Sequence, residues 1–158
     1  MSAIKQGLGS EILAERHEVA TRSPNWDAIN DILIVEDDSI DGNRLVGTLR
    51  VVFGREVNVR WAKTLTAAVD EVLAGIPDIV FLDDILKPDD TAAETIPYLR
   101  RAGYDGHIIV ISGEVTRKRL NELVRLGATT AVHKDDLDSA AVRAALLKTV
   151  ANPPTQAQ

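Results

Sequence analysis

Short apolar runs alternate with amphipathic segments along the chain from residue 31 onward. The runs at 32–35, 79–82 and 108–111 are continuous and rich in β-branched residues, which is typical of strands buried on both faces of a sheet. A shorter run follows at 131–132. Residues 57–62 alternate instead, with Val57, Val59 and Trp61 on one face. The pattern therefore predicts five strands, of which the one at 57–62 is the most exposed.

Apolar residues recur at helical spacing between these strands. They predict helices at 39–53, 65–73 and 116–126, and a last helix from 138 or 139 to about 150. Ser39 is a candidate N-cap for the helix at 39–53. Gly54 and Gly127 are placed to end two of these helices. In the helix at 116–126, Leu120, Leu123 and Val124 are expected to face inward.

One helix has two possible starts. Thr91 and Glu94 have the spacing of a capping box. A helix that began there would hold Pro97 in its interior, where proline removes a hydrogen bond and clashes with the preceding turn. We therefore expect this helix to begin near Thr95 and to end before Gly103.

The alternation of strands and helices predicts a (βα)5 domain with a parallel, doubly wound sheet. The strand order expected is 2-1-3-4-5, that of flavodoxin-like folds. This domain is expected to span residues 30–151. Residues 1–29 are interpreted as an N-terminal extension with one possible helix, and residues 152–158 as a disordered tail.

Composition narrows the possible functions. Cysteine is absent, which excludes disulfides and thiolate metal sites and agrees with a cytoplasmic location. The formal net charge is −6, which argues against a nucleic-acid surface. The cationic stretch at 117–119 is interpreted as a solvated helix face. No apolar run approaches the roughly 20 residues of a membrane span, and the first residues lack the apolar core of a secretory signal.

Polar residues follow four of the predicted strands. They are Glu36, Asp37 and Asp38 after the first strand, Asp83 and Asp84 after the third, Ser112 after the fourth and Lys134 after the fifth. In open α/β sheets, ligands bind beyond the carboxyl ends of the strands. In the predicted strand order these ends are neighbours, so we expect one acidic pocket with a hydroxyl and an amine at its rim.

Such a pocket suits phosphoryl transfer with a divalent cation. Close carboxylates repel one another unless a cation lies among them, and Mg²⁺ prefers hard oxygen ligands. Lysine can hold phosphoryl oxygens as a point charge, and a serine hydroxyl can donate one further hydrogen bond. A carboxylate beside the ion can act as the nucleophile and form an aspartyl phosphate.

Four sequence stretches resemble the receiver domains of two-component response regulators. They are ILIVEDD (32–38), PDIVFLDD (77–84), IIVISG (108–113) and GATTAVHK (127–134). The resemblance implies that Glu36 and Asp37 bind Mg²⁺, directly or through water. It also implies that Ser112 and Lys134 contact the phosphoryl group, and that a histidine kinase or histidine phosphotransferase is the donor.

The resemblance implies that Asp83 is the phosphoacceptor, because it lies six residues after Pro77 as in the family's pattern. The loop proline of the family usually follows the acceptor by four residues, and Pro88 has that spacing from Asp84. An inserted loop residue explains this better than a strand slip, which would reverse every inward side chain. With Asp83 as the acceptor, the backbone carbonyl of Ile85 is the expected third protein ligand of the metal.

The sequence also departs from the family's pattern. Asp135 replaces the proline that usually follows the lysine, and Ala131 replaces the aromatic residue that usually moves inward on activation. Gly113 replaces the alanine that usually follows the hydroxyl residue. The chemistry is therefore expected to be intact, while the way in which the signal is passed on is expected to differ.

We expect a single-domain response regulator that acts through contacts with a target protein, with a kinase or as a homodimer, because little chain follows the last predicted helix. A degenerate receiver that only binds proteins is one alternative. An aspartyl phosphohydrolase is less favoured, since its motif needs a second aspartate at position 85, which is Ile85. A nucleotide- or flavin-binding domain is disfavoured because no glycine-rich loop follows the first strand.

Overall fold

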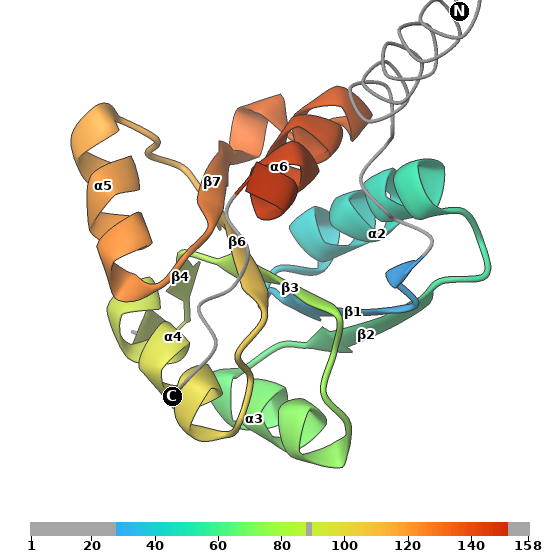
Figure 1. The fold of residues 1–158 in the computed structure, drawn as a ribbon, viewed down its shortest axis with the longest axis horizontal. Helices are drawn as coiled ribbons and strands as arrows, with labels where there is room; N and C mark the ends of the chain where they lie inside the picture. The colour runs from blue at the N-terminus through green and yellow to red at the C-terminus, as the bar shows by residue number, and fades with distance from the viewer. Residues whose placement is uncertain (1–27, 88–89, 152–158) are drawn as a thin grey trace, which may run out of the picture.

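A parallel sheet of five strands forms the centre of the molecule (Figure 1). The computed structural model describes residues 28–87 and 90–151. The sheet strands are β1 (Asp31–Val35), β2 (Asn58–Ala62), β3 (Ile79–Asp83), β6 (His107–Ser112) and β7 (Thr130–His133), in the order β2-β1-β3-β6-β7. Counted along the chain, this is the order 2-1-3-4-5, so the predicted fold class is confirmed.

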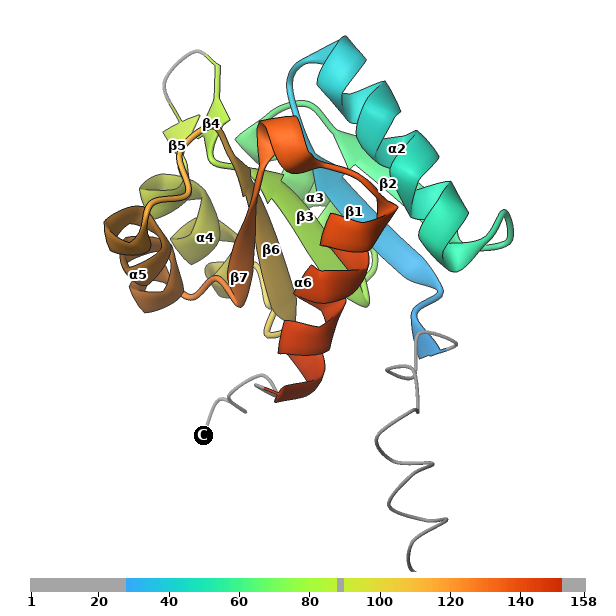
Figure 2. The ribbon, with the colours of Figure 1, turned by 90° about the horizontal axis from the view of Figure 1, so that it is seen from above.

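Helices cover both faces of the sheet (Figures 1 and 2). Helices α2 (Ser39–Phe53) and α6 (Ser139–Ala151) pack together on one face. Helices α3 (Leu65–Ala74), α4 (Ala92–Arg101) and α5 (Arg117–Leu126) cover the other. Each layer encloses its own apolar core, and β3 contributes to both, with Phe81 in the α2–α6 core and Leu82 in the α3–α4–α5 core.

The helix ends agree with the predicted caps at three positions and differ at one. Gly54 and Gly127 follow α2 and α5 with positive φ angles of 89° and 115°, a conformation that glycine adopts without strain. Asp138 caps α6 by accepting a hydrogen bond from the amide of Ala141. The N-cap of α2 is Asp38, whose carboxylate accepts from two amides of the first turn, so the assignment to Ser39 was wrong.

Helix α4 begins earlier than expected. Its N-cap is Thr91, and Glu94 completes a capping box by accepting hydrogen bonds from the Thr91 amide and hydroxyl at 2.7 and 2.6 Å. Pro97 lies inside the helix and removes one backbone hydrogen bond, to the carbonyl of Ala93. Residue Ala93 is exposed, so water can reach this turn. The start near Thr95 was wrong: the capping box and the buried helix residues Ala92, Ile96 and Leu99 accompany a helix that accepts the proline.

Two short elements lie outside the predicted pattern. Strands β4 (Ile85–Leu86) and β5 (Asp90–Thr91) pair in an antiparallel hairpin between β3 and α4. A 3-10 turn, η2 (Lys134–Asp136), follows β7. Both elements lie at the carboxyl edge of the sheet, so they shape the region where the polar residues were expected.

Helix α5 contacts the sheet through fewer residues than the sequence predicted. Val124 was expected to face inward, which is wrong, because its side chain is 48% exposed. Leu123 is fully buried and carries the contact of α5 with the sheet. The possible N-terminal helix and the tail at 152–158 lie outside the described residues.

Helix α2 approaches β2 closely at one glycine. A Cβ atom on Gly42 would lie within 2 Å of the indole ring of Trp61, so this position accepts only glycine unless the ring moves. The Trp61 ring in turn donates a hydrogen bond of 2.7 Å from Nε1 to the backbone carbonyl of Glu36. Gly42 thus lets an aromatic side chain support the chain directly after β1.

Candidate functional site

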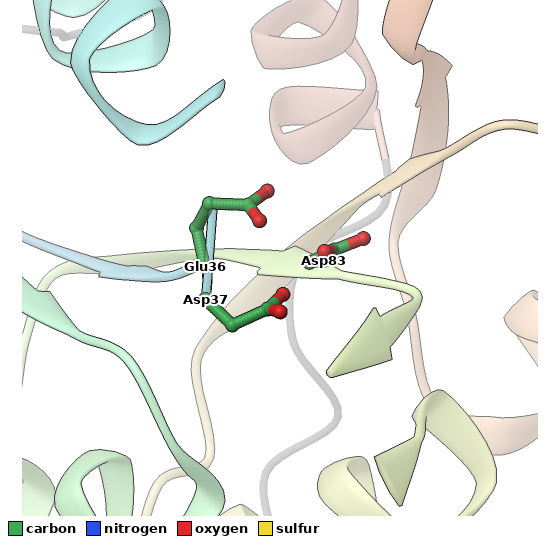
Figure 3. Close-up of side chains that lie close together, drawn as sticks. All are labelled: Glu36, Asp37 and Asp83. Carbon is green, nitrogen blue, oxygen red and sulfur yellow. The ribbon is translucent and has the colours of Figure 1, made fainter. Parts of the chain in front are cut away.

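Three carboxylates gather at the carboxyl edge of the sheet (Figure 3). Glu36 and Asp37 follow β1, and Asp83 is the last residue of β3, its neighbour in the sheet. Each of the three side chains offers an oxygen, and these oxygens all lie within 4.8 Å of one another. Glu36 and Asp83 are buried, and Asp37 is half-buried. The structure therefore brings together the three acidic residues that the sequence placed in one pocket.

Lys134 lies on the opposite side of Asp83, at the start of the turn η2. Its Nζ atom is 3.1 Å from Oδ1 of Asp83 and 3.9 Å from Oδ2 of Asp41. The lysine side chain is one-third exposed, whereas that of Asp83 is 2% exposed. Asp83 thus has one cation and two acids among its neighbours.

Burial controls the protonation of this cluster. Burial and, to a lesser degree, the neighbouring Asp83 carboxylate raise the pKa of Glu36 to about 8, against an opposing hydrogen bond from the Asp38 amide. Burial also raises the pKa of Asp83, although Glu36 and Lys134 oppose this shift. The protein therefore holds these acids where their charge is unfavourable without a cation.

The donor set fits Mg²⁺. The ion takes hard oxygen ligands and is usually held by one or two carboxylates together with water and phosphate oxygens. Glu36, Asp37 and Asp83 supply carboxylates from two adjacent strands. The Ile85 carbonyl, the expected backbone ligand, stays a prediction. What the structure places is the Ile85 amide, which donates to Asp83 Oδ1 at 3.3 Å.

Asp84 meets entirely different neighbours from Asp83. Its side chain is 7% exposed and forms an ion pair with Arg119 of α5, with Nη2 at 2.5 Å from Oδ1 and Nε at 3.2 Å from Oδ2. The hydroxyl of Ser112 donates to Oδ2 of Asp84 at 2.8 Å. Ser112, which was expected to serve Asp83, is thus bonded to the neighbouring carboxylate.

Strand geometry explains the difference between the two aspartates. Successive side chains of a strand point to opposite faces of the sheet. Asp83 follows the alternation to the side of Phe81, under α2 and α6, and Asp84 to the side of Leu82, under α3, α4 and α5. Val110 of β6 belongs to the α3–α4–α5 core. Ser112, two residues later in the same strand, points to the same face and so lies on the side of Asp84.

Arg119 is the site residue that the sequence interpretation missed. The stretch at 117–119 was interpreted as a solvated helix face, which is wrong for Arg119, whose side chain is 23% exposed and paired with a buried carboxylate. Its partner lies 35 positions earlier in the chain. Helical position alone could have indicated that Arg119 faces the sheet, since Leu123, four residues later, is buried on the same helix face.

An open cavity of about 550 Å³ extends from Asp83 toward α5. Three cationic and four acidic side chains contribute to its wall. The lining residues are Asp83, Asp84, Ile85, Ser112, Gly113, Glu114, Thr116, Lys118, Arg119, Glu122 and Lys134. The cavity is open to solvent and reaches both Asp83 and Lys134.

The departures from the family's pattern alter the surroundings of this cavity. Asp135, in the place of the usual proline, takes part in η2, and its amide donates to Nδ1 of His133 at 3.0 Å. Ala131 is half-buried and lines a second, open groove of about 420 Å³ between β7 and α6.

Comparison with known proteins agrees with this architecture. Residues 32–146 match the model of the response regulator receiver domain. The chain belongs to this family. No curated protein sequence matches it. Within the parts of the chain that the structure describes, none of the receiver's helices has the length and apolarity needed to cross a membrane.

Solved receiver domains share the fold at low sequence identity. The signal receiver domain of a DNA binding response regulator (merR) from Colwellia psychrerythraea 34H is 24% identical with a TM-score of 0.62, over 77% of this chain and 98% of that one. The receiver domain of the histidine kinase CKI1 from Arabidopsis thaliana, complexed with Mg²⁺ and BeF₃⁻, is 20% identical with a TM-score of 0.61, over 78% and 94%. The receiver domain of the response regulator NarL from Mycobacterium tuberculosis is 19% identical with a TM-score of 0.58, over 77% and 92%.

Proposed function

We propose that this receiver accepts a phosphoryl group on Asp83 from the phosphohistidine of a histidine kinase or histidine phosphotransferase, and that Mg²⁺ is its cofactor. The observation that carries the proposal is the position of Asp83, whose carboxylate lies within 4.8 Å of those of Glu36 and Asp37 and 3.1 Å from Lys134. Asp84, the alternative acceptor, has its carboxylate occupied by Arg119 and Ser112.

Each residue has a defined part in the reaction. A carboxylate oxygen of Asp83 attacks the phosphorus atom, the bond from phosphorus to the donor's imidazole nitrogen breaks, and the electron pair of that bond returns to the imidazole. Lys134 neutralises charge on the transferred phosphoryl group. Glu36, Asp37, Asp83 and the Ile85 carbonyl would hold Mg²⁺, which would supply positive charge to offset the negative charge of the transfer. The reaction needs positioning more than covalent assistance, and the strand ends provide it.

The output of the switch is a change in binding. Phosphorylation adds between one and two negative charges at pH 7, which is enough to attract nearby cations and hydroxyl groups. The surface formed by α5, β7 and α6 contains the groove beside Ala131 and adjoins Lys134, so it is the surface best placed to change. A target protein, the kinase itself or a second copy of the chain would bind there, in the cytoplasm.

Acetyl phosphate tests the proposal directly. The protein is incubated with acetyl phosphate and Mg²⁺, and its intact mass is measured. We expect a gain of one phosphoryl group that is lost in Asp83→Asn and retained in Asp84→Asn. The matched pair separates the two neighbours in one experiment.

Other outcomes would favour other functions. Modification that survives in Asp83→Asn but is lost in Asp84→Asn would reassign the acceptor. Failure of the wild type to gain mass with acetyl phosphate or with a phosphorylated kinase would indicate a degenerate receiver that only binds proteins. Sustained release of inorganic phosphate from many phosphate esters would indicate an aspartyl phosphohydrolase.

A further inference from the structure

The hydroxyl group of Ser112 has more acceptors than it can serve. It carries one proton, and two oxygens lie within bonding distance, Oδ2 of Asp84 at 2.8 Å and the backbone carbonyl of Glu114 at 2.9 Å. The carboxylate is the stronger acceptor because it is charged. Ser112 is also 1% exposed, so water does not compete for this proton. Asp84 therefore holds the hydroxyl.

This contact conflicts with the part that Ser112 would play at Asp83. If Asp83 is phosphorylated, as proposed above, the hydroxyl of Ser112 is the donor expected to bond a phosphoryl oxygen. A single proton cannot serve the phosphoryl group and Asp84 at once. Binding of the phosphoryl group through Ser112 therefore requires that the bond to Asp84 break.

Asp84 can lose this bond without being left unpaired. Arg119 contacts both of its oxygens, and a guanidinium group has five donors in a fixed planar arrangement that matches a carboxylate. The loop after Ser112 also has room to move, since Gly113 is exposed and has no atom within 4 Å of an added Cβ position. Arg119 lies in the first turns of α5, so the same residue links Asp84 to that helix.

We propose that Asp84 is a positioning residue that, together with Arg119, retains Ser112 in the unphosphorylated arrangement, and that the phosphoryl group on Asp83 must displace it. This inference rests on the proposed phosphoacceptor function. It adds a contact, between Asp84 and Ser112, that opposes the phosphorylated arrangement. The resting contact makes the active arrangement less favourable. It also makes the loop between β6 and α5 the first segment to move on activation.

Beryllofluoride, a phosphoryl mimic, measures this competition at equilibrium. Its dissociation constant in saturating Mg²⁺ is determined by isothermal titration calorimetry for the wild type, Asp84→Ala, Ser112→Ala and the double variant. We expect Asp84→Ala to bind about tenfold more tightly than the wild type, because the hydroxyl starts free. In the Ser112→Ala background the same substitution should change the affinity by less than about twofold, because there is no hydroxyl to release.

The cycle distinguishes positioning from charge. An equal gain in both backgrounds would overturn the proposal, because it would trace the effect to the lost negative charge or to a freed Arg119. No gain in either background would overturn it as well. Should Asp84→Ala fail to fold, Asp84→Asn keeps the size and a weaker acceptor, and we expect a gain of about threefold that also depends on Ser112.

Failure of the proposed function would look different. In that case the wild type would bind no beryllofluoride and gain no mass from acetyl phosphate. A wild type that does both, with an Asp84→Ala variant of equal affinity, would leave the phosphoacceptor function standing and remove only the opposing part of Asp84.

Discussion

Asp83 and Asp84 are adjacent in the chain, but they face opposite sides of the sheet and opposite kinds of neighbours. Asp83 lies among two acids and one lysine, in a cluster that favours an added cation. Asp84 lies against a guanidinium and a hydroxyl, and its charge is already compensated. The same side chain in consecutive positions is thus the proposed phosphoacceptor in one place and a member of an ion pair in the other.

The difference shows how a strand end can separate two functions over a single residue. The alternation of side chains gives each aspartate a different set of helices, and each set brings its own charged residues to the carboxyl edge. Ser112 belongs by its strand position to the Asp84 side and by its proposed chemistry to the Asp83 side. It is the residue through which the two sides can communicate.

The largest expected difference is between the loss of Lys134 and the loss of Arg119, measured as the affinity for beryllofluoride. We expect Lys134→Met to weaken beryllofluoride binding about 100-fold, because the anion loses a charged partner within the site. Arg119→Met should change the affinity by less than about threefold, because Arg119 serves the other face. Equilibrium titration in saturating Mg²⁺ measures both. A comparable loss in the two variants would mean that the two faces act as one site.

Neutralisation of the two aspartates should change stability in opposite directions. Without Mg²⁺, we expect Asp83→Asn to raise the free energy of unfolding, because it removes a charge that burial disfavours. Asp84→Asn should lower it by about 1–2 kcal/mol, because a buried ion pair with Arg119 is weakened. Urea unfolding at pH 7 with EDTA gives both values. Destabilisation by both substitutions would refute the contrast.

The Asp83 side should also make stability depend on pH. The pKa of Glu36 rises from its ordinary value of 4.5 to about 8 in the folded protein, so the folded state binds a proton that the unfolded state has released. The stability from this group is present below pH 4.5 and is lost as the pH rises through about 8. We expect the melting temperature without Mg²⁺ to fall by roughly 5–10 °C between pH 6 and 8.5 from this cause.

Two controls complete the pH experiment. Glu36→Gln should flatten the dependence, because it removes the titrating group. Mg²⁺ should reduce the loss at pH 8.5 in the wild type, because the cation replaces the proton among the carboxylates. A slope that is unchanged in Glu36→Gln would assign the effect to another residue.

The sequence was sufficient to predict the fold and the group of polar residues around Asp83. Buried strands have a strong apolar signal, and parallel strand ends must meet at one edge, so the grouping of Glu36, Asp37, Asp83 and Lys134 could be predicted from their places after strands. The start of α4 was misjudged because the weight of a capping box against one interior proline depends on solvent access to the turn. That access is a tertiary property.

The Asp84 half of the site was beyond the same reasoning. The pair between Asp84 and Arg119 joins a strand end to a helix across 35 positions. The helical spacing from Arg119 to Leu123 indicates which of the three cations faces inward, but it does not indicate which carboxylate that cation meets. The Ser112 hydroxyl could donate to either of two adjacent carboxylates, those of Asp83 and Asp84. The sequence indicates which of these two carboxylates is nearer to Ser112 only when the register of β3 against β6 is known.

The closeness of Trp61 to the site has a practical consequence. The indole donates a hydrogen bond to the backbone carbonyl of Glu36. The missing side chain of Gly42 lets the ring pack closely against α2. An indole in such a position emits light whose intensity responds to nearby charge. Since Trp26 is the other tryptophan of the chain, its replacement by phenylalanine would leave one intrinsic fluorophore that reports events at the carboxylates without any attached label.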